Sequence, residues 1–256
     1  MEASISLKSI GKKITDKTVL AELSFGLQKG SCLAIVGPNN SGKSSIIKLL
    51  SGIIYKDKGQ LYIEGEDISL NPENVKKITG YMSQKIDFNL TLSLFDNICL
   101  YAELFGLSNR DAIDKANNLC HRFSINAYKN KKVSAVPENI TRIAMFIRSV
   151  IHDPEIILLD EPTLNFDVEC KKIFWEYIVE KCQNKTIIFS TQNLEEAKTY
   201  SNRIAIIHDA SIKFLGTYKE LSDDSYSDFT LEEYLLNLNR SYIDRWEIFL
   251  FFLKKN

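Results

Sequence analysis

One stretch of this 256-residue chain combines glycines, a lysine and a serine at the spacing of a phosphate-binding loop. Residues 37–44 read GPNNSGKS, which fits the pattern G-x-x-x-x-G-K-[ST]. Glycines let the backbone turn tightly, so that successive N–H groups point at phosphate oxygens. The Lys43 ammonium would reach the β- and γ-phosphates of a nucleotide, and the Ser44 hydroxyl would bind Mg²⁺. The pattern predicts a nucleotide-binding loop made of Gly37, Pro38, Asn39, Asn40, Ser41, Gly42, Lys43, Ser44 and Ser45.

Two neighbouring carboxylates end an apolar stretch in the second half of the chain, where residues 156–161 read IILLDE. In enzymes with a phosphate loop of this kind, an aspartate at a strand end completes the Mg²⁺ shell. The next carboxylate can orient or deprotonate the attacking water. We therefore expect Asp160 to join Ser44 as a metal ligand, and Glu161 to act in catalysis.

Strand-like and helix-like segments alternate around both motifs. Residues 31–36 form a short apolar run that leads into the glycine loop, and residues 43–50 then have helical character. Alternating strands and helices are typical of a mainly parallel sheet that is covered on both faces. After the carboxylates, the same pattern predicts the strands 155–159, 186–190 and 203–208 and the helices 168–182 and 194–201.

A helix-rich block interrupts this alternation. Residues 92–123, with a break near 106–108, and residues 139–151 have helical periodicity, so we expect an inserted helical subdomain at about 85–153. A polar turn at Asp223 precedes helical stretches in which Thr230 suits an N-cap. These features predict an α/β domain over residues 1–222 and a helical C-terminal tail over residues 223–256. Further strands are expected at 5–10, 19–27, 60–63 and 78–83.

The composition is that of an ordinary globular protein, with 45% hydrophobic and 25% charged residues. A total of 32 Lys and Arg against 33 Asp and Glu gives a net charge of −1, which argues against a dedicated nucleic-acid surface. The five cysteines include no C-x-x-C pair, so we expect reduced thiols rather than a zinc site or disulfides. The longest apolar run, residues 248–253, is too short to span a bilayer. We expect a protein that is soluble or reaches a membrane only through a partner.

The motifs together resemble those of the ATP-binding cassette (ABC) ATPases over about residues 5–222. GPNNSGKSS looks like the Walker A loop of that family, and ILLDEPT looks like its Walker B strand. Gln84 stands where the family keeps its Q-loop glutamine, residues 164–167 stand where its D-loop lies, and residues 203–216 look like its final strands and turn. The resemblance implies an α/β P-loop NTPase fold with a mainly parallel core sheet, an antiparallel β subdomain and the inserted helical subdomain.

The resemblance also implies roles and partners. The family's Q-loop glutamine touches Mg²⁺ and the attacking water and links the site to the membrane subunit, so Gln84 would be both catalytic and a metal ligand. Two cassettes of the family face head to tail, with ATP between one Walker A loop and the other's signature loop. Residues 89–107 are most similar to export-type cassettes. We expect ATP and Mg²⁺ as cofactors, a membrane-spanning permease subunit and a second ABC cassette as partners, and a peripheral location at the cytoplasmic face of the membrane.

Three parts of the sequence depart from the family pattern. Its L-S-G-G-Q signature falls on residues 136–140, VPENI, where no position matches. Pro137 lacks an N–H group, and the Glu138 carboxylate would repel a phosphate. Gln192 stands where the family has its switch histidine, and it would donate a hydrogen bond to a γ-phosphate without carrying a positive charge. Ile10 stands near the family's adenine-stacking aromatic, so it would keep an apolar contact without stacking.

These departures leave two functions open. The chain is either an ATP hydrolase that couples to export, or a largely non-hydrolysing regulatory cassette paired with an active one. Loss of one transition-state donor typically lowers a rate by about 10²–10³-fold. A homodimer would carry both defects at both sites, so we favour a heterodimer with a more regular cassette, or a slow ATPase. A soluble cassette of DNA repair or translation is disfavoured, because the chain has no long coiled-coil insertion and no second cassette.

Overall fold

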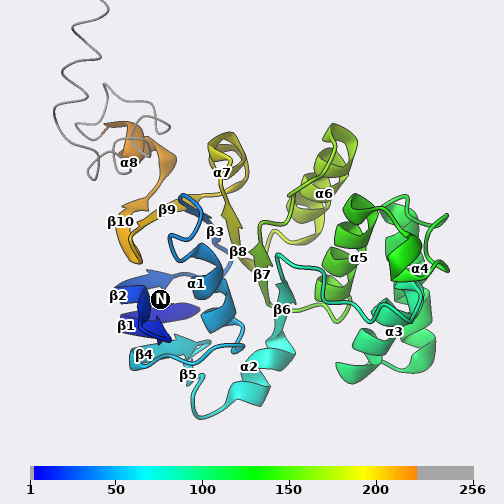
Figure 1. The fold of residues 1–256 in the computed structure, drawn as a ribbon, viewed down its shortest axis with the longest axis horizontal. Helices are drawn as coiled ribbons and strands as arrows, with labels where there is room; N and C mark the ends of the chain where they lie inside the picture. The colour runs from blue at the N-terminus through cyan, green and yellow to red at the C-terminus, as the bar shows by residue number, and fades with distance from the viewer. Residues whose placement is uncertain (1–2, 224–256) are drawn as a thin grey trace, which may run out of the picture.

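The computed structural model describes residues 3–223 and arranges them around two β-sheets (Figure 1). The first sheet has the order β2-β1-β4-β5, and its neighbouring strands are antiparallel. Along its central strand, buried Ile5 and Leu7 alternate with the more exposed Ser6 and Lys8, a pattern typical of a sheet with one buried face. The strands are β1 (Ile5–Ile14), β2 (Lys17–Leu27), β4 (Lys58–Ile63) and β5 (Glu66–Asp67).

The second sheet is mainly parallel. Its order is β10-β9-β3-β8-β7-β6; β10 pairs antiparallel with β9, whereas the other neighbouring strands are parallel. Its central strands β7 and β8 are buried at every position, as expected for strands covered on both faces. The strands are β3 (Cys32–Val36), β6 (Thr79–Met82), β7 (Ile156–Asp160), β8 (Thr186–Thr191), β9 (Arg203–His208) and β10 (Ser211–Gly216).

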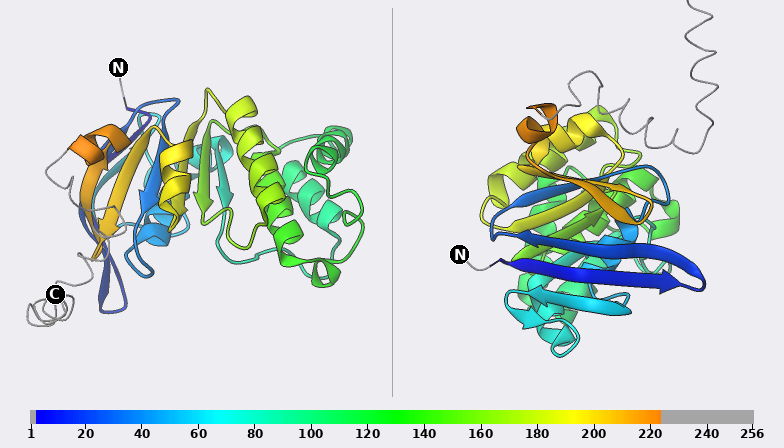
Figure 2. Two further views of the ribbon diagram at one scale, coloured as in Figure 1. Left: turned by 90° about the horizontal axis from the view of Figure 1, so that it is seen from above. Right: turned by 90° about the vertical axis from the view of Figure 1, so that its left-hand side faces the viewer.

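Three α-helices and a short 3₁₀ helix lie between β6 and β7 in the sequence. They form a block at the end of the molecule away from the antiparallel sheet (Figures 1 and 2). Ser93 and Ser108 accept hydrogen bonds from backbone N–H groups in the first turns of two of these helices, which fixes where the helices begin. The block comprises α3 (Leu94–Leu104), α4 (Asn109–Arg122), the short 3₁₀ helix Val133–Ala135 and α5 (Glu138–Val150). It occupies the place expected for an inserted helical subdomain.

The remaining helices pack against the sheets or their connecting loops. They are α1 (Lys43–Leu50), α2 (Pro72–Ile78), α6 (Val168–Lys181), α7 (Leu194–Tyr200) and α8 (Tyr218–Asp223).

The parallel sheet separates two hydrophobic cores, because successive residues of a strand face opposite sides. Leu33 and Ile35 of β3 face the core that contains α1 and the antiparallel sheet. Ala34 and Val36 face the other core, which contains side chains of α5 and α6. Helix α1 therefore packs between the two sheets, and its first turn follows the loop that leaves the carboxyl end of β3.

The expected elements around the motifs are confirmed to within a few residues, including helix 43–50 and strand 203–208. The expected helix 92–123 is two helices, interrupted at residues 105–108 where the break was predicted. Helix α2 was not predicted, because only Val75 of its seven residues is buried and no apolar period marks it. The predicted tail, Thr230 included, lies outside the described residues beyond Asp223.

The five cysteines are free thiols, as expected: Cys99, Cys120 and Cys182 are buried, and Cys32 and Cys170 are partly buried. Burial raises the pKa of the Cys120 thiol to about 11, so it stays protonated at neutral pH. Within residues 3–223, no helix is long and apolar enough to cross a membrane.

Candidate functional site

Residues 39–45 of the predicted phosphate loop line a hollow of about 210 Å³ beside the first turn of α1, whereas Gly37, Pro38 and Asp160 are not part of its lining. Two residues expected from elsewhere in the chain, Gln84 and Glu161, line the same hollow. The structure therefore brings together residues that the sequence analysis placed in one site from three separate segments. The lining consists of Lys17, Val19, Asn39, Asn40, Ser41, Gly42, Lys43, Ser44, Ser45, Gln84 and Glu161.

The two glycines of the loop are required by its backbone. A Cβ at Gly37 would lie 2.2 Å from a backbone carbonyl oxygen, and a Cβ at Gly42 would lie 2.7 Å from another. Gly42 also has a φ of 111°, in the region that side chains rarely adopt. The loop wraps closely around the buried Lys43, whose Nζ donates to the carbonyl oxygens of Gly37 at 2.8 Å and Pro38 at 3.1 Å. Burial lowers the pKa of this ammonium.

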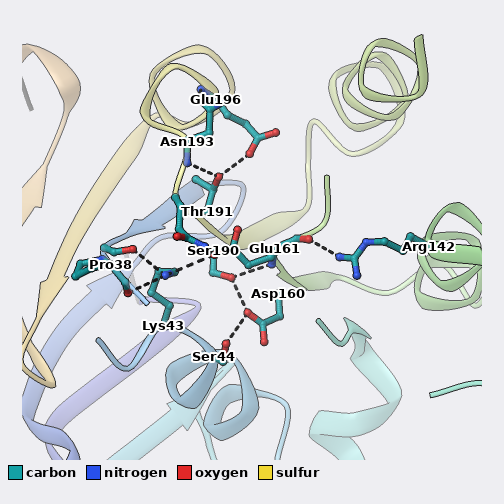
Figure 3. Close-up of polar contacts among 12 residues, drawn as sticks. Pro38, Lys43, Ser44, Arg142, Asp160, Glu161, Ser190, Thr191, Asn193 and Glu196 are labelled. Carbon is teal, nitrogen blue, oxygen red and sulfur yellow. Dashed lines mark hydrogen bonds and ion pairs between the residues drawn. The ribbon is translucent and has the colours of Figure 1, made fainter. Parts of the chain in front are cut away.

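A polar pair joins α1 to the end of β7. The Ser44 hydroxyl donates to Oδ1 of Asp160 at 2.9 Å, and the Ser190 hydroxyl of β8 donates to the same oxygen at 2.7 Å (Figure 3). Oδ2 of Asp160 is buried and has no hydrogen-bond partner among the described residues. A hydroxyl and a carboxylate with a spare oxygen, next to a hollow that an amide also lines, are the hard oxygen donors that suit Mg²⁺. These residues therefore fit the expected metal.

Glu161 occupies a strained position immediately after β7. Its φ of 48° is unusual for a residue with a long side chain, and such strain persists only where the surroundings hold it. Its N–H donates to the hydroxyl of Ser190 at 2.9 Å. Its Oε1 lies 3.5 Å from Nζ of Lys43 and accepts a hydrogen bond from Nε2 of Gln192 at 3.3 Å. The carboxylate is thus aimed at the loop rather than at solvent.

The sequence of the chain carries the family assignment. Residues 20–164, more than half of the chain, match the sequence model of the family described as "ABC transporter". The chain belongs to the ABC transporter family. It is an ATP-binding cassette of that family, and the relatives below are also named as ATP-binding proteins. "ABC transporter ATP-binding protein NatA" of Bacillus subtilis (strain 168) is 26% identical over 88% of this chain and 94% of its own length.

Two other relatives have names that refer to transported compounds. "Nod factor export ATP-binding protein I" of Rhizobium sp. (strain N33) is 25% identical over 96% of this cassette and 84% of its own length. "Probable multidrug ABC transporter ATP-binding protein YbhF" of Escherichia coli (strain K12) is 26% identical over 93% of this cassette but 42% of its own length.

Solved structures share the fold of the cassette. An ATP-binding subunit of an ABC transporter superposes with a TM-score of 0.83 at 23% identity, covering 92% of this chain and 99% of that one. A dimeric bacterial ABC transporter cassette superposes with a TM-score of 0.77 at 19% identity, covering 83% of this chain and 98% of that one. These likenesses confirm the predicted α/β cassette fold, with its parallel-rich sheet, antiparallel sheet and helices.

The expectation about Ile10 is wrong. This side chain is fully buried in the core beneath the antiparallel sheet and does not line the hollow. Lys17 and Val19 of β2 line it instead. Ile14, whose strand position pairs with Lys17, keeps 47% of its surface exposed. No residue pattern indicated this shift, because β1 continues four residues beyond its expected end.

Gln192 is exposed at the end of β8 and is absent from the lining of the hollow, but its amide donates a hydrogen bond to Glu161.

A buried carboxylate that the sequence analysis did not single out lies close to the end of β8. Glu196 of α7 accepts hydrogen bonds from the hydroxyls of Thr163 at 2.5 Å and Thr191 at 2.7 Å and from Nε1 of Trp175 at 3.1 Å. This cluster ties the loop after β7 to the end of β8.

Residues 136–140, which align with the family's signature, lie at the start of α5. Pro137 precedes the helix and offers no side-chain cap. Glu138 accepts a hydrogen bond through Oε1 from Nδ2 of Asn165, at 3.0 Å. Asn165 belongs to the segment at the D-loop position and has a φ of 63°. The carboxylate at position 138 is therefore held against the loop that follows the Asp160–Glu161 pair.

Proposed function

We propose that this cassette binds Mg-ATP in the hollow, hydrolyses it slowly, and couples that cycle to export through a separate membrane permease subunit. The observation that carries the proposal is the convergence of Lys43, Ser44, Asp160 and Glu161 at the first turn of α1. These four side chains lie beside the backbone N–H groups of the loop and of the first turn of α1, which can bind an anion.

Each residue has a role that follows from its chemistry. The loop of residues 37–45 binds the phosphates through its N–H groups, and Lys43 leaves the carbonyl oxygens of Gly37 and Pro38 to bind the terminal phosphates. Ser44, Asp160 and Gln84 would hold Mg²⁺, which neutralises phosphate charge when it is bound. Glu161 orients the attacking water and accepts its proton. Gln192 holds the Glu161 carboxylate and offers a neutral donor where a histidine would offer a charged one.

The membrane role rests on the family and on relatives whose names refer to export and multidrug transport. The cassette would lie at the cytoplasmic face of the membrane, held there by the permease. The permease would contact the segment from Gln84 to Thr91, which continues directly from the hollow. Ile86 and Leu90 of this segment are exposed apolar side chains, 39% and 57% accessible, and suit contact with a helix of the permease.

We favour a heterodimer with a second, more regular cassette. The lost histidine at Gln192 weakens the hollow of this chain, and the sequence 136–140 weakens the hollow of a facing cassette. Glu138 would place negative charge beside the partner's nucleotide. The same two departures support the alternative function, a regulatory cassette that binds ATP and barely hydrolyses it.

Substitution of Glu161 by Gln separates these two functions. The chain and its permease partner are reconstituted in vesicles, and ATP binding, phosphate release and substrate export are measured. For an active cassette, Glu161→Gln retains ATP binding but lowers phosphate release by about 10²–10³-fold and stops export. For a regulatory cassette, export persists in the variant. Glu155→Gln is the matched control, because Glu155 is an exposed carboxylate that precedes β7 at its other end.

A further inference from the structure

Helix α5 carries a buried arginine that reaches two segments of the hollow at once. The Arg142 side chain is 1% exposed. Its Nη1 donates to the backbone carbonyl of Gln84 at 2.7 Å, and its Nη2 donates to the backbone carbonyl of Glu161. Figure 3 shows the guanidinium approaching Glu161 from the helical side of the site. The two acceptor residues, Gln84 and Glu161, both line the hollow.

Burial of the Arg142 guanidinium costs free energy, so packing alone does not explain why an arginine stands here. Burial lowers the pKa of Arg142, and Nε has no partner among the described residues. A well-packed apolar side chain of similar volume is often as stable as a buried charge. What an apolar side chain cannot do is donate to two carbonyls on separate segments with one rigid, planar group.

The contact with Glu161 completes the support of a strained residue. The N–H of Glu161 donates to Ser190 in β8, while its carbonyl accepts from Arg142 in α5. Both backbone polar groups of a residue with φ 48° are thereby bound to different elements. The direction of the Glu161 carboxylate depends on this backbone, because the side chain projects from it.

We infer that Arg142 is a positioning residue that sets Gln84 and Glu161 relative to each other and couples both to α5. This inference rests on the proposed function, in which Gln84 holds Mg²⁺ and Glu161 orients the attacking water in the same hollow. A rotation of the helical block would move both backbones together through one guanidinium. The signature segment precedes α5 directly, so the start of the same helix faces the second cassette in the proposed dimer.

Arg148 provides a matched comparison on the same helix. It is also buried, at 8% exposed, and its Nη2 lies 2.7 Å from Oδ1 of Asp87. Its guanidinium lies 4.9 Å from the ring centre of Phe88. Arg148 thus holds the same chain segment as Arg142, but its contacts are with Asp87, Phe88 and Tyr101, none of which lines the hollow. A purely structural role for α5 arginines would give the two positions the same effects.

The test compares Arg142→Met, Arg142→Lys and Arg148→Met in the full chain. Three properties are measured: ATP affinity with a fluorescent analogue, kcat for phosphate release, and hydrogen exchange of residues 83–88 and 161–164. We expect Arg142→Met to keep the ATP dissociation constant within about threefold, because no phosphate contact is lost. We expect kcat to fall about 10- to 100-fold through misplacement of the reacting groups. Exchange should rise in both segments together, and Arg142→Lys should recover part of each loss.

Arg148→Met should raise exchange near Asp87 and leave residues 161–164 as in the wild type. The inference is overturned if Arg142→Met leaves exchange at 161–164 unchanged, or if Arg148→Met lowers kcat by the same factor. Failure of the proposed function has a separate signature, which is wild-type protein that binds no ATP or releases no phosphate with its partner. In that case the exchange measurement alone decides the role of Arg142.

Discussion

Nζ of Lys43 lies 3.5 Å from Oε1 of Glu161, and both side chains are less than 10% exposed. The ammonium is therefore paired with the carboxylate and donates hydrogen bonds to two loop carbonyls. Phosphate oxygens would compete for the same ammonium. Occupation of the loop would release Glu161 from Lys43 and leave its carboxylate available for water. In the proposed cycle, binding and catalysis would be linked through this pair, because binding of phosphate to Lys43 would free Glu161.

Substitution of Lys43 by Ala should weaken ATP binding by about 10- to 100-fold, because a charge-assisted contact with phosphate contributes about 1.5–3 kcal/mol. Titration with a fluorescent ATP analogue measures the effect. Lys48→Ala is the matched control, since Lys48 lies in the last turn of the same helix and does not line the hollow. Equal affinities for wild type and Lys43→Ala would place the nucleotide elsewhere.

Substitution of Gln192 by His should raise the rate of phosphate release about tenfold. The position already contacts Glu161, and an imidazole there could bind the terminal phosphate with positive charge. Steady-state release at saturating ATP, measured with the partner cassette present, gives the comparison. Gln192→Ala controls for loss of the amide and should lower the rate below that of the wild type. A rate for Gln192→His that matches Gln192→Ala would show that the limiting defect lies elsewhere, for example in the signature segment.

Much of the fold was predictable because local signals and tertiary packing agree. The apolar run at 156–159 is buried in β7, and the carboxylates that follow it lie at the strand end, as the pattern requires. Parallel strands place their carboxyl ends at one edge of the sheet, so the glycine loop after β3 and the Asp160–Glu161 pair after β7 had to meet.

Other features depend on three-dimensional relationships that no local pattern encodes. Ile10 and Ile14 are both apolar residues of β1, and only the length and bulges of that strand decide that Ile10 is buried whereas Ile14 is exposed. Arg142 reads as one more polar residue of an amphipathic helix until its distance to Gln84 is known. Glu196 likewise looks like a solvent-facing residue of α7, but three donors from separate segments surround it.

Restoration of the signature should allow this chain to form a dimer with itself. In a Glu161→Gln background with ATP present, we expect the natural segment to leave the protein monomeric, because Glu138 repels the facing phosphate. The double change Pro137→Ser and Glu138→Gly removes that charge and adds an N–H group. Sedimentation velocity with and without ATP measures the association.

The serine in this double variant also caps α5, which contributes about 1 kcal/mol to stability by itself. Pro137→Ser with Glu138→Asp therefore serves as the control, since it adds the same cap but keeps a carboxylate. Dimerisation of the control to the same extent would show that helix capping, rather than charge, limits assembly. Dimerisation of the unchanged segment would remove the argument for a heterodimer.

A partly buried histidine at the end of the helical block, with both ring nitrogens buried, should make stability depend on pH. The ring of His152 lies against Phe105, tilted by 35° with 4.0 Å between centroids, and burial lowers its pKa to about 4. Lys115 and Lys185 also disfavour its charged form, whereas Asp153 favours it. An unfolded histidine has a pKa near 6.5, so the unfolded chain binds more protons between these two values. Folding stability is therefore lost as the pH falls from about 6.5 towards 4.

Urea unfolding at pH 7 and pH 5 measures this loss, which for His152 amounts to as much as about 2 kcal/mol. The His152→Gln variant has a similar volume and no charge at either pH. Carboxylates that titrate in the same range do so in both proteins, so the difference between the two pH dependences isolates the histidine. Wild type and variant that lose equal stability between pH 7 and pH 5 would show that His152 is reached by water and titrates normally. A larger loss in the wild type would confirm that the packing of α3 against the end of α5 keeps this ring neutral.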